Sequence, residues 1–414
     1  MNASLKSRDD VVRQRAERPT RFFLTGGTGF LGSHLAVALL RKGHRVCLLA
    51  RSLEQRSAES RVQALLDWFG LPADCRRELR VIEGDVTRPG LGVEPALLRE
   101  VLQHTDEIVH CASNTAFSER KRVEVEAVNG GGLSQVLECA RASSAYFFHH
   151  VSTAFVAGNT SGRCAEEPAT PRGFYNAYEE TKCRGEWTVM AACRDTGLRL
   201  AIYRPSIVYG DSRTGRSLLF NALYYPVRTA LFIKDLYERD IRQEGGRKAE
   251  EMGVRMEGDG TIRLPLRIEV VREGGINLIP VDFFTDAFLS IMEGAPDGGI
   301  FHLVNDRVTR IEEIINYTCR LFRMTGIGPC GPEAFAALPR NAIEMLFDHY
   351  VEPYVQYMRD ARRFEATNSR PLLRRSGVRC PEFDYEMFAR CMLFAIEASW
   401  RSPLLTTRHV IQQQ

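Results

Sequence analysis

The stretch Thr25-Gly26-Gly27-Thr28-Gly29-Phe30-Leu31-Gly32 decides the fold of this chain. It follows a short apolar strand predicted over residues 21–24 and opens a helix predicted over residues 32–42. The first glycine of Gly-x-x-Gly-x-x-Gly allows a tight turn, the second lets the backbone approach a phosphate, and the third lets the helix pack close to the strand. The helix N-terminus offers free N–H groups and a partial positive charge to a pyrophosphate. The stretch therefore predicts a dinucleotide-binding strand–turn–helix.

Short apolar segments alternate with helical ones from this turn as far as Gly210. Such alternation implies right-handed crossovers and a parallel sheet covered on both faces, with ligand at the carboxyl ends of the strands. We therefore predict an α/β, doubly wound parallel-sheet Rossmann fold. Further strands are expected over 45–50, 79–83, 107–111, 145–151 and 198–203, and helices over 59–69, 125–140 and 175–195.

The rhythm breaks after Gly210 and returns briefly at 276–281 and 301–305. The last part of the chain has helical patterning over 310–322, 333–346, 354–363 and 385–400. We expect an NADP-binding Rossmann domain over 21–214, with 276–305 returning to it, and a smaller, mostly helical C-terminal substrate-binding lid over 215–275 and 306–414. Residues 1–20 are polar and mixed in charge, which predicts a disordered tail.

The composition is that of an ordinary globular protein, with 44% apolar and 26% charged residues among 414. The net charge of +3 gives no general reason to expect nucleic acid or a membrane as partner. The eleven cysteines include no C-x-x-C pair, which favours reduced thiols in a cytoplasmic protein. The sequence contains no zinc-binding pattern, so no metal is expected. Residues 22–40 carry no formal charge, but their four internal glycines and His34 favour the strand–turn–helix over a transmembrane segment.

The end of the second predicted strand bears on the choice between NAD and NADP. It reads Ala50-Arg51-Ser52, and no acidic residue follows until Glu54. An acid there would bind the ribose 2′-hydroxyl, whereas an arginine suits a 2′-phosphate in both geometry and charge. Arg51 lies near the spacing of about 20 residues at which this group is read. We therefore predict NADPH as the cofactor; the alternative is that Arg51 is a solvated surface residue.

Tyr178 and Lys182 are four residues apart and so share one face of the helix predicted over 175–195. A phenol with a pKa near ~10 is a poor acid–base group at neutral pH, and a neighbouring ammonium is expected to lower that pKa. The pair follows Val151-Ser152-Thr153-Ala154, where a hydroxyl at a strand end can bind a reacting carbonyl oxygen. Since Ser152 and Thr153 alternate in direction, only one of them is expected to face the nicotinamide. The alternative is a surface tyrosine beside a surface lysine.

Over about residues 21–305 the chain resembles the extended short-chain dehydrogenase/reductases. The likeness rests on T-G-G-T-G-F-L-G at 25–32, G-D-V at 84–86, H-C-A-S at 110–113, V-N-G at 128–130, V-S-T-A-F-V-A-G at 151–158, Y-E-E-T-K at 178–182 and R-P-S-I-V-Y-G at 204–210. It implies that Thr153, with Ser152 as the fallback, forms the catalytic set with Tyr178 and Lys182, and that Asn129 braces the site. The implied cofactor contacts are Gly26, Thr28, Gly29, Phe30, Leu31, Gly32, Arg51, Asp85, Val86, Cys111, Ala112, Ser113, Tyr178, Lys182, Pro205, Ser206 and Val208.

Within that superfamily the chain looks most like the thioester-reductase and fatty acyl-CoA reductase branch, through stretches such as N-L-I-P-V-D-F-F-T-D-A at 277–287 and F-H-L-V-N at 301–305. It departs from sugar epimerases, because Val156-Ala157-Gly158 lacks their common tyrosine. It also departs from many relatives in showing no membrane tail and no fused adenylation or carrier domain.

The resemblance implies that NADPH reduces an acyl thioester, bound to coenzyme A or to an acyl carrier protein, to an aldehyde. A second hydride would give an alcohol. Thr153 and Tyr178 would stabilise or protonate the oxyanion. Two alternatives remain: an NADP-dependent dehydrogenase or epimerase of an alcohol, sterol or nucleotide sugar, and a non-catalytic dinucleotide-binding module. A homodimer is left open.

Basic residues cluster in the predicted lid around the apolar run Leu218–Phe232. They could bind the phosphates of coenzyme A or an acidic carrier protein, with the apolar run lining an acyl channel. The alternative, which we favour, is an amphipathic helix with one buried and one solvated face. His110, His149, His150 and His302 are expected to be structural. The basic residues are Arg213, Arg216, Arg228, Lys234, Arg239, Arg242, Arg247 and Lys248.

Overall fold

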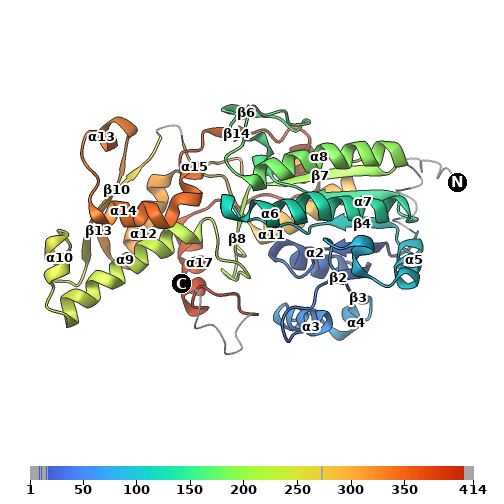
Figure 1. Cartoon of the computed structure of the whole chain (residues 1–414), viewed down its shortest axis with the longest axis horizontal. Coiled ribbons are helices and arrows are strands. Elements are labelled where there is room, and N and C mark those ends of the chain that lie inside the picture. Colours follow the sequence, from blue (N-terminus) through green and yellow to red (C-terminus); the bar gives the residue numbers. More distant parts are fainter. Residues whose placement is uncertain (1–8, 10, 12–14, 16, 272–273, 405–414) are drawn as a thin grey trace. The chain divides into compact units, whose positions relative to one another are not determined.

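The computed structural model describes residues 9, 11, 15, 17–271 and 274–404 (Figure 1). These residues form two compact units. The first comprises Met1–Ser206, Val281–Val304 and Phe364–Arg379, and the second comprises Ile207–Pro280, Asn305–Arg363 and Cys380–Gln414. The first boundary lies at Ser206 where the sequence suggested 214, and residues 276–280 belong to the second unit. The return of residues 364–379 to the first unit was not predicted.

The first unit is built on a seven-stranded sheet whose neighbouring strands all pair in parallel. The strand order is β12-β7-β5-β4-β1-β2-β3, which confirms the predicted Rossmann architecture. The strands are β1 (Arg21–Thr25), β2 (Arg45–Ala50), β3 (Leu79–Glu83), β4 (Glu107–His110), β5 (Phe147–Val151), β7 (Arg199–Pro205) and β12 (Gly299–Leu303).

Helices cover both faces of this sheet, as the doubly wound prediction requires. On one face, α2 (Phe30–Arg41) contacts α11 (Val281–Gly294), and Phe288 of α11 packs on Tyr203 of β7 with ring centroids 4.2 Å apart. On the other face, α7 (Leu133–Arg141) contacts α8 (Ala177–Thr196), and both share an apolar core with the strands. The remaining helices are α3 (Ala58–Trp68), α4 (Ala73–Arg76), α5 (Pro95–Gln103), α6 (Arg122–Glu126) and α16 (Ser369–Ser376).

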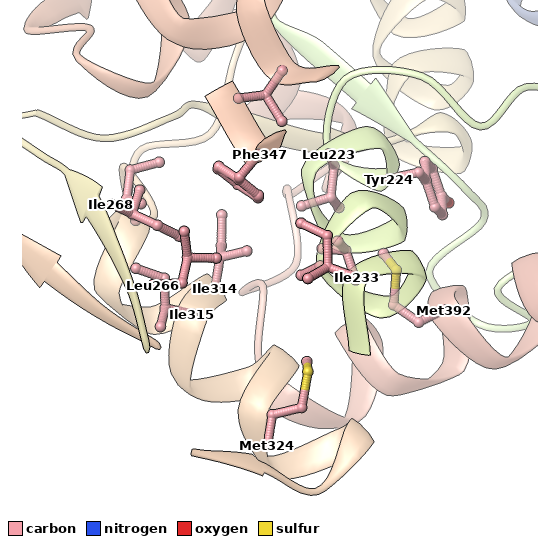
Figure 2. Close-up of a cluster of buried hydrophobic side chains, with 14 of the residues drawn as sticks. Leu223, Tyr224, Ile233, Leu266, Ile268, Ile314, Ile315, Met324, Phe347 and Met392 are labelled. Carbon is pink, nitrogen blue, oxygen red and sulfur yellow. The ribbon is translucent and has the colours of Figure 1, made fainter. Parts of the chain in front are cut away.

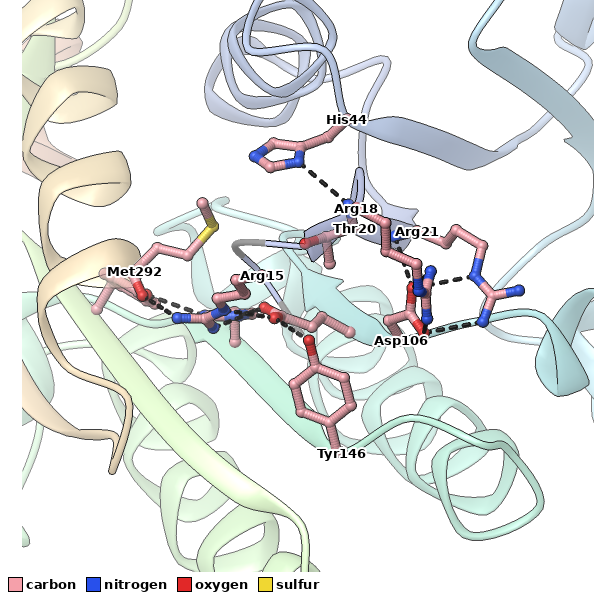
Figure 3. Close-up of polar contacts among 11 residues, drawn as sticks. Arg15, Arg18, Thr20, Arg21, His44, Asp106, Tyr146 and Met292 are labelled. Atoms are coloured by element: carbon pink, nitrogen blue, oxygen red, sulfur yellow. Dashed lines mark hydrogen bonds and ion pairs between the residues drawn. The ribbon is translucent and has the colours of Figure 1, made fainter. Parts of the chain in front are cut away.

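A polar network ties the segment before β1 to the start of β4 (Figure 3). The carboxylate of Glu107, fully buried, accepts hydrogen bonds from Arg15 Nε and Nη2 at 2.7 and 2.8 Å, from the Tyr146 hydroxyl at 2.9 Å and from His149 Nε2 at 2.7 Å. Arg15 also donates to the Met292 carbonyl. Arg15 is therefore attached to the sheet, unlike the disordered tail that the sequence predicts over 1–20; residues 1–8, 10, 12–14 and 16 lie outside the described part.

The second unit has its own core of buried side chains (Figure 2). Its helices are α9 (Tyr224–Gln243), α10 (Arg247–Glu251), α12 (Ile311–Phe322), α13 (Pro332–Ala336), α14 (Ala342–Val351), α15 (Val355–Met358) and α17 (Tyr385–Glu397). The unit also contains a three-stranded sheet of order β13-β10-β9, built from β13 (Met324–Cys330), β10 (Ile262–Glu269) and β9 (Arg255–Met256), and a parallel pair of β8 (Ile207–Tyr209) with β11 (Leu278–Pro280).

The second unit is mostly helical, as predicted, but its three-stranded sheet was not predicted. In β10, Ile262, Leu264, Leu266 and Ile268 are buried and the residues between them are more exposed, which is the period of a half-buried strand. Residues 354–363, predicted as one helix, instead contain α15 and part of the short strand β14 (Arg362–Phe364). No helix among the described residues is long and apolar enough to cross a membrane.

We expect Arg15→Met to lower the free energy of unfolding by about 3–5 kcal/mol, because it leaves a buried carboxylate without its cation. Burial alone would raise the pKa of Glu107, but the His149 hydrogen bond and the Arg15 charge hold it at about 2. That stabilisation is present above the unfolded pKa of ~4.3 and is lost as the pH falls toward 2. Urea unfolding at pH 7 and at pH 3 measures both effects.

Arg18→Met is the matched control, because the Arg18 side chain is 41% exposed and its partner Asp106 keeps two hydrogen bonds from the Arg21 side chain. Its removal should cost less than about 1 kcal/mol. Equal losses in the two variants would contradict a special role for the Arg15–Glu107 pair.

Candidate active site

The glycine turn lies directly against the backbone that follows β4. Gly26 has φ +78°, and a Cβ built on it would lie 2.4 Å from the Ala112 nitrogen and 2.6 Å from the Cys111 carbonyl carbon. A Cβ on Gly32 would lie 2.2 Å from the Gly26 oxygen. Neither position can carry a side chain without displacing backbone, so both glycines have the structural roles that the sequence predicts.

The turn opens α2, whose N-terminus is free to bind an anion. Gly29 is the N-cap and supplies no side-chain hydrogen bond, and the first turn carries no acidic residue. Its N–H groups and partial positive charge therefore suit a pyrophosphate. The predicted contacts Thr28, Phe30 and Leu31 lie in this turn and first helical turn. β1 and β4 are neighbours whose connections run in opposite directions, so their carboxyl ends form the switch point at which such sheets bind ligands.

Asn129 connects the loop after β4 to α8. Its amide oxygen accepts from the Ser113 hydroxyl at 3.0 Å and from the Asn114 N–H at 2.8 Å. Its amide nitrogen donates to the Asn114 carbonyl at 3.0 Å and to the Thr181 hydroxyl at 3.1 Å. Asn129 sits in a π-helical segment, Ala127–Gly132, a local insertion often found at functional sites. The bracing role implied by the resemblance thus has a geometric basis: four hydrogen bonds fix Ser113 relative to the helix of Tyr178 and Lys182.

The three predicted catalytic side chains lie at the end of β5 and the start of α8. The Thr153 hydroxyl acts on the Tyr178 phenol and lowers its pKa; it also accepts from the Phe155 N–H at 3.3 Å. Lys182, 4% exposed, donates from Nζ to the Val151 carbonyl at 2.6 Å. Asn176 caps α8 by accepting from the Glu179 N–H, which fixes where the helix begins and so where Tyr178 points. Thr153, rather than Ser152, is the hydroxyl that meets the phenol.

The electrostatics of the pair differ from the sequence expectation. Burial raises the pKa of Tyr178 to about 12 and outweighs the hydrogen bond from Thr153, which lowers it. Burial also lowers the pKa of Lys182 to about 8. The predicted lowering of the phenol pKa by the lysine is therefore wrong for this structure. The loss of solvation destabilises the phenolate more than any neighbouring group stabilises it. A phenol that stays protonated at neutral pH is a proton donor.

Arg51 does not stand alone at the end of β2. Arg56 and Arg61 follow in the same loop and the start of α3, and burial followed by the charges of Arg51 and Arg56 lowers the pKa of Arg61. Arg51 Nη1 approaches Asp85 Oδ2 at 3.5 Å. Burial would raise the pKa of Asp85, but hydrogen bonds from Thr87, followed by the charge of Arg51, lower it. The sequence analysis singled out only Arg51, although the i, i+5, i+10 spacing of the three arginines is visible in the sequence.

The other predicted residues lie at several places around the sheet. Val86, 8% exposed, packs against the π-helical segment, where a Cβ on Gly132 would lie 2.9 Å from a Val86 methyl carbon. Pro205 ends β7, and the Ser206 N–H donates to the Leu303 carbonyl at 3.1 Å. Val208 lies in β8 of the second unit. Among the histidines, His149 bonds to Glu107 and Tyr203, and His302 Nδ1 lies 2.6 Å from the Glu365 carbonyl oxygen, as structural residues would.

Comparisons with known proteins identify the family of this chain. The NAD-binding family described as male sterility protein matches residues 24–287. A fatty acyl-CoA reductase of Drosophila melanogaster is 26% identical over 249 residues, covering 50% of this chain and 47% of the relative. The chain covers between 5% and 51% of the curated relatives considered.

Two solved structures share the fold over most of the chain. The terminal R domain of the myxalamid biosynthetic pathway superposes with a TM-score of 0.71 at 21% identity, covering 93% of this chain and 92% of that one. An archaeal thiolation-reductase di-domain gives a TM-score of 0.66 at 16% identity, covering 96% and 82%. The family match spans the glycine turn, Thr153, Tyr178 and Lys182. The chain therefore belongs to the male sterility protein family of NAD-binding proteins.

Proposed function

We propose that this protein uses NADPH to reduce an acyl thioester, carried by coenzyme A or by a carrier protein, to an aldehyde. The observation that carries the proposal is the pairing of the buried Thr153 hydroxyl with the half-buried phenol of Tyr178, which is protonated at neutral pH. Reduction of a carbonyl needs a proton donor beside the hydride source, whereas oxidation of an alcohol needs a base. The named relatives support the thioester, because they include a fatty acyl-CoA reductase and a thiolation-reductase di-domain.

In the proposed reaction, a bound NADPH supplies the hydride. As the thioester carbonyl carbon becomes tetrahedral, its oxygen gains negative charge, and the hydroxyls of Thr153 and Tyr178 would donate hydrogen bonds to it. Transfer of the Tyr178 proton would give a hemithioacetal, which collapses to an aldehyde and a free thiol. Lys182 would donate a hydrogen bond to a ribose hydroxyl. Its positive charge would favour return of a proton to the Tyr178 phenolate. A second cycle on the aldehyde would give an alcohol.

The choice of NADPH over NADH rests on Arg51, Arg56 and Arg61. The charges of Arg51 and Arg56 act on the guanidinium of Arg61 and, after burial, lower its pKa; an anion bound beside these like charges would be attracted to them. A 2′-phosphate at the end of β2 is such an anion, and guanidinium matches it in geometry. The fit of the rest of the cofactor is supported by the turn in which Gly26 and Gly32 leave no room for a Cβ.

The basic residues of the predicted lid do not support carrier binding in the same way. On α9 and α10, Lys234 and Arg242 both pair with Glu238, and Lys248 pairs with Glu244. Pairing within and between adjacent helical turns is the pattern of a solvated helix face. These contacts favour the amphipathic-helix interpretation.

Tyr178→Phe should lower kcat for thioester reduction by about 10²–10⁴-fold, because it removes the proton donor, while the Kd for NADPH changes little. Stopped-flow NADPH absorbance with an acyl-coenzyme A and an acyl carrier protein measures the first, and fluorescence titration the second. Tyr175→Phe, at a 43% exposed tyrosine three residues earlier, is the control and should be near wild type. Full activity in Tyr178→Phe, or NADP⁺ reduction by alcohols without thioester turnover, would refute the proposed reaction.

The arginine cluster predicts graded cofactor selectivity. Arg51→Ala, Arg56→Ala and Arg61→Ala should each weaken NADPH binding by about tenfold or more, because each removes a charged hydrogen-bond donor. NADH binding should stay within about twofold, since NADH lacks the phosphate. Arg77→Ala, in the loop before β3, is the matched control. Parallel losses for both cofactors would remove the cluster from cofactor selection.

The pKa of Lys182 predicts an alkaline limit on cofactor binding. Because the ammonium loses its proton as the pH rises through about 8, kcat/KM for NADPH should fall above that pH. This fall of kcat/KM is the alkaline limb of the pH profile. Tyr178, with a pKa of about 12, adds no second limb below pH 10. Lys182→Arg should abolish the limb, because a guanidinium stays charged throughout this range. A limb that persists in Lys182→Arg would assign it to another group.

A further inference from the structure

Three polar side chains interrupt an otherwise apolar row across the middle of the sheet. In the strand register Thr25 faces His110, and His110 faces His150. The next residues of the row are Leu49 on β2 and Ile202 on β7. His110 Nδ1 lies 2.8 Å from the Thr25 hydroxyl, and the rings of His110 and His150 stack with centroids 5.6 Å apart and planes 11° apart. The proposed mechanism uses none of these groups.

His150 is 1% exposed, and neither of its ring nitrogens has a hydrogen-bond partner among the described residues. The hydroxyl of Ser152, which is 4% exposed, also has no hydrogen-bond partner among the described residues. Each unpaired buried group costs about 1–3 kcal/mol, and buried polar groups in native proteins nearly always have a partner, ordered water included. The apolar neighbours in the row show that an apolar residue would suit this position for stability alone. The unpaired nitrogens therefore point to a partner.

Lys182 is the charged group that acts on these side chains. Its ammonium has three N–H donors, and one of them goes to the carbonyl of Val151, the residue between His150 and Ser152. Residues two apart along an extended strand point to the same side, so His150 and Ser152 flank that carbonyl. Burial, followed by the Lys182 charge, lowers the pKa of His150, so the ring stays a neutral acceptor. The other groups that act electrostatically on Lys182 or its surroundings are His110, Cys111 and Glu186.

We propose that His150, held by its stack on His110, is a positioning residue that fixes the Lys182 ammonium through one buried water shared with the Ser152 hydroxyl. Three polar partners are what an internal water needs. The inference rests on the proposed function only in that Lys182 must hold the cofactor. His150 thereby restrains a long, flexible side chain that a single carbonyl would leave free to turn, and it helps to keep the ammonium charged.

The test is the pH dependence of NADPH binding, measured by fluorescence titration without any thioester. His150→Phe keeps a ring to stack on His110 and removes both nitrogens. We expect Kd at pH 7 to rise about tenfold and the alkaline limb to move about one unit lower, since a tenfold change corresponds to one pKa unit. His150→Gln restores an acceptor and should return both values to within about threefold of wild type.

His149→Gln is the matched control, because His149 is the neighbouring histidine on the opposite face, where it bonds to Glu107 and Tyr203. It should lower the free energy of unfolding and leave the binding profile unchanged. Ser152→Ala, a small change, removes another of the water's three partners and should move the limb in the same direction if His150→Phe does not fold. An unmoved limb in the folded variants overturns the inference. A moved limb in a protein that reduces no thioester would overturn the proposed function alone.

Discussion

The close approach of two backbones at Gly26 is the constraint on which the rest of this site depends. The turn after β1 lies against Cys111 and Ala112 after β4, with no room for even a methyl group between them. That contact brings the N-terminus of α2 to the switch point of the sheet, where a pyrophosphate can be bound by backbone N–H groups alone. Asn129 then ties the same loop to α8, so that the positions of Tyr178 and Lys182 follow from the position of the turn.

Burial, more than any single neighbour, sets the chemistry of the catalytic pair. It raises the pKa of Tyr178 and lowers that of Lys182, so that each is pushed toward its uncharged form. A reductase benefits from the first shift, because the phenol holds its proton until charge develops on the substrate oxygen. The second shift makes every contact that keeps the ammonium charged important, and for this reason the unpaired nitrogens of His150 next to Val151 are informative. The same rule governs the Arg15–Glu107 pair, where a buried charge is tolerated only because three side chains bind it.

Much of the first unit could be predicted from the sequence, because its signals are local. Gly26 and Gly32 mark a turn that no other residue type could make, and the apolar strands of a sheet buried on both faces are short and bounded by turns. The Tyr178–Lys182 spacing needs only the period of a helix. In contrast, the prediction of a disordered tail was wrong for Arg15. Its partner Glu107 lies 92 residues away in the sequence, so no local pattern indicates the contact. The sheet of β10 and β13 was missed because Met324–Cys330 has no alternation, and its pairing is visible only in three dimensions. Burial by residues distant in the sequence also decides the pKa of Tyr178, which the spacing to Lys182 predicted with the wrong sign.

The most direct measurement is the fate of the hydride. Purified protein, NADPH carrying deuterium at the transferred position and an acyl thioester would be mixed, and the products analysed by mass spectrometry together with a free-thiol assay. The account predicts one deuterium at the carbonyl carbon of the aldehyde and one thiol released for each NADPH consumed. Consumption of NADPH without thiol release, or with deuterium elsewhere in the product, would contradict reduction of a thioester at this site.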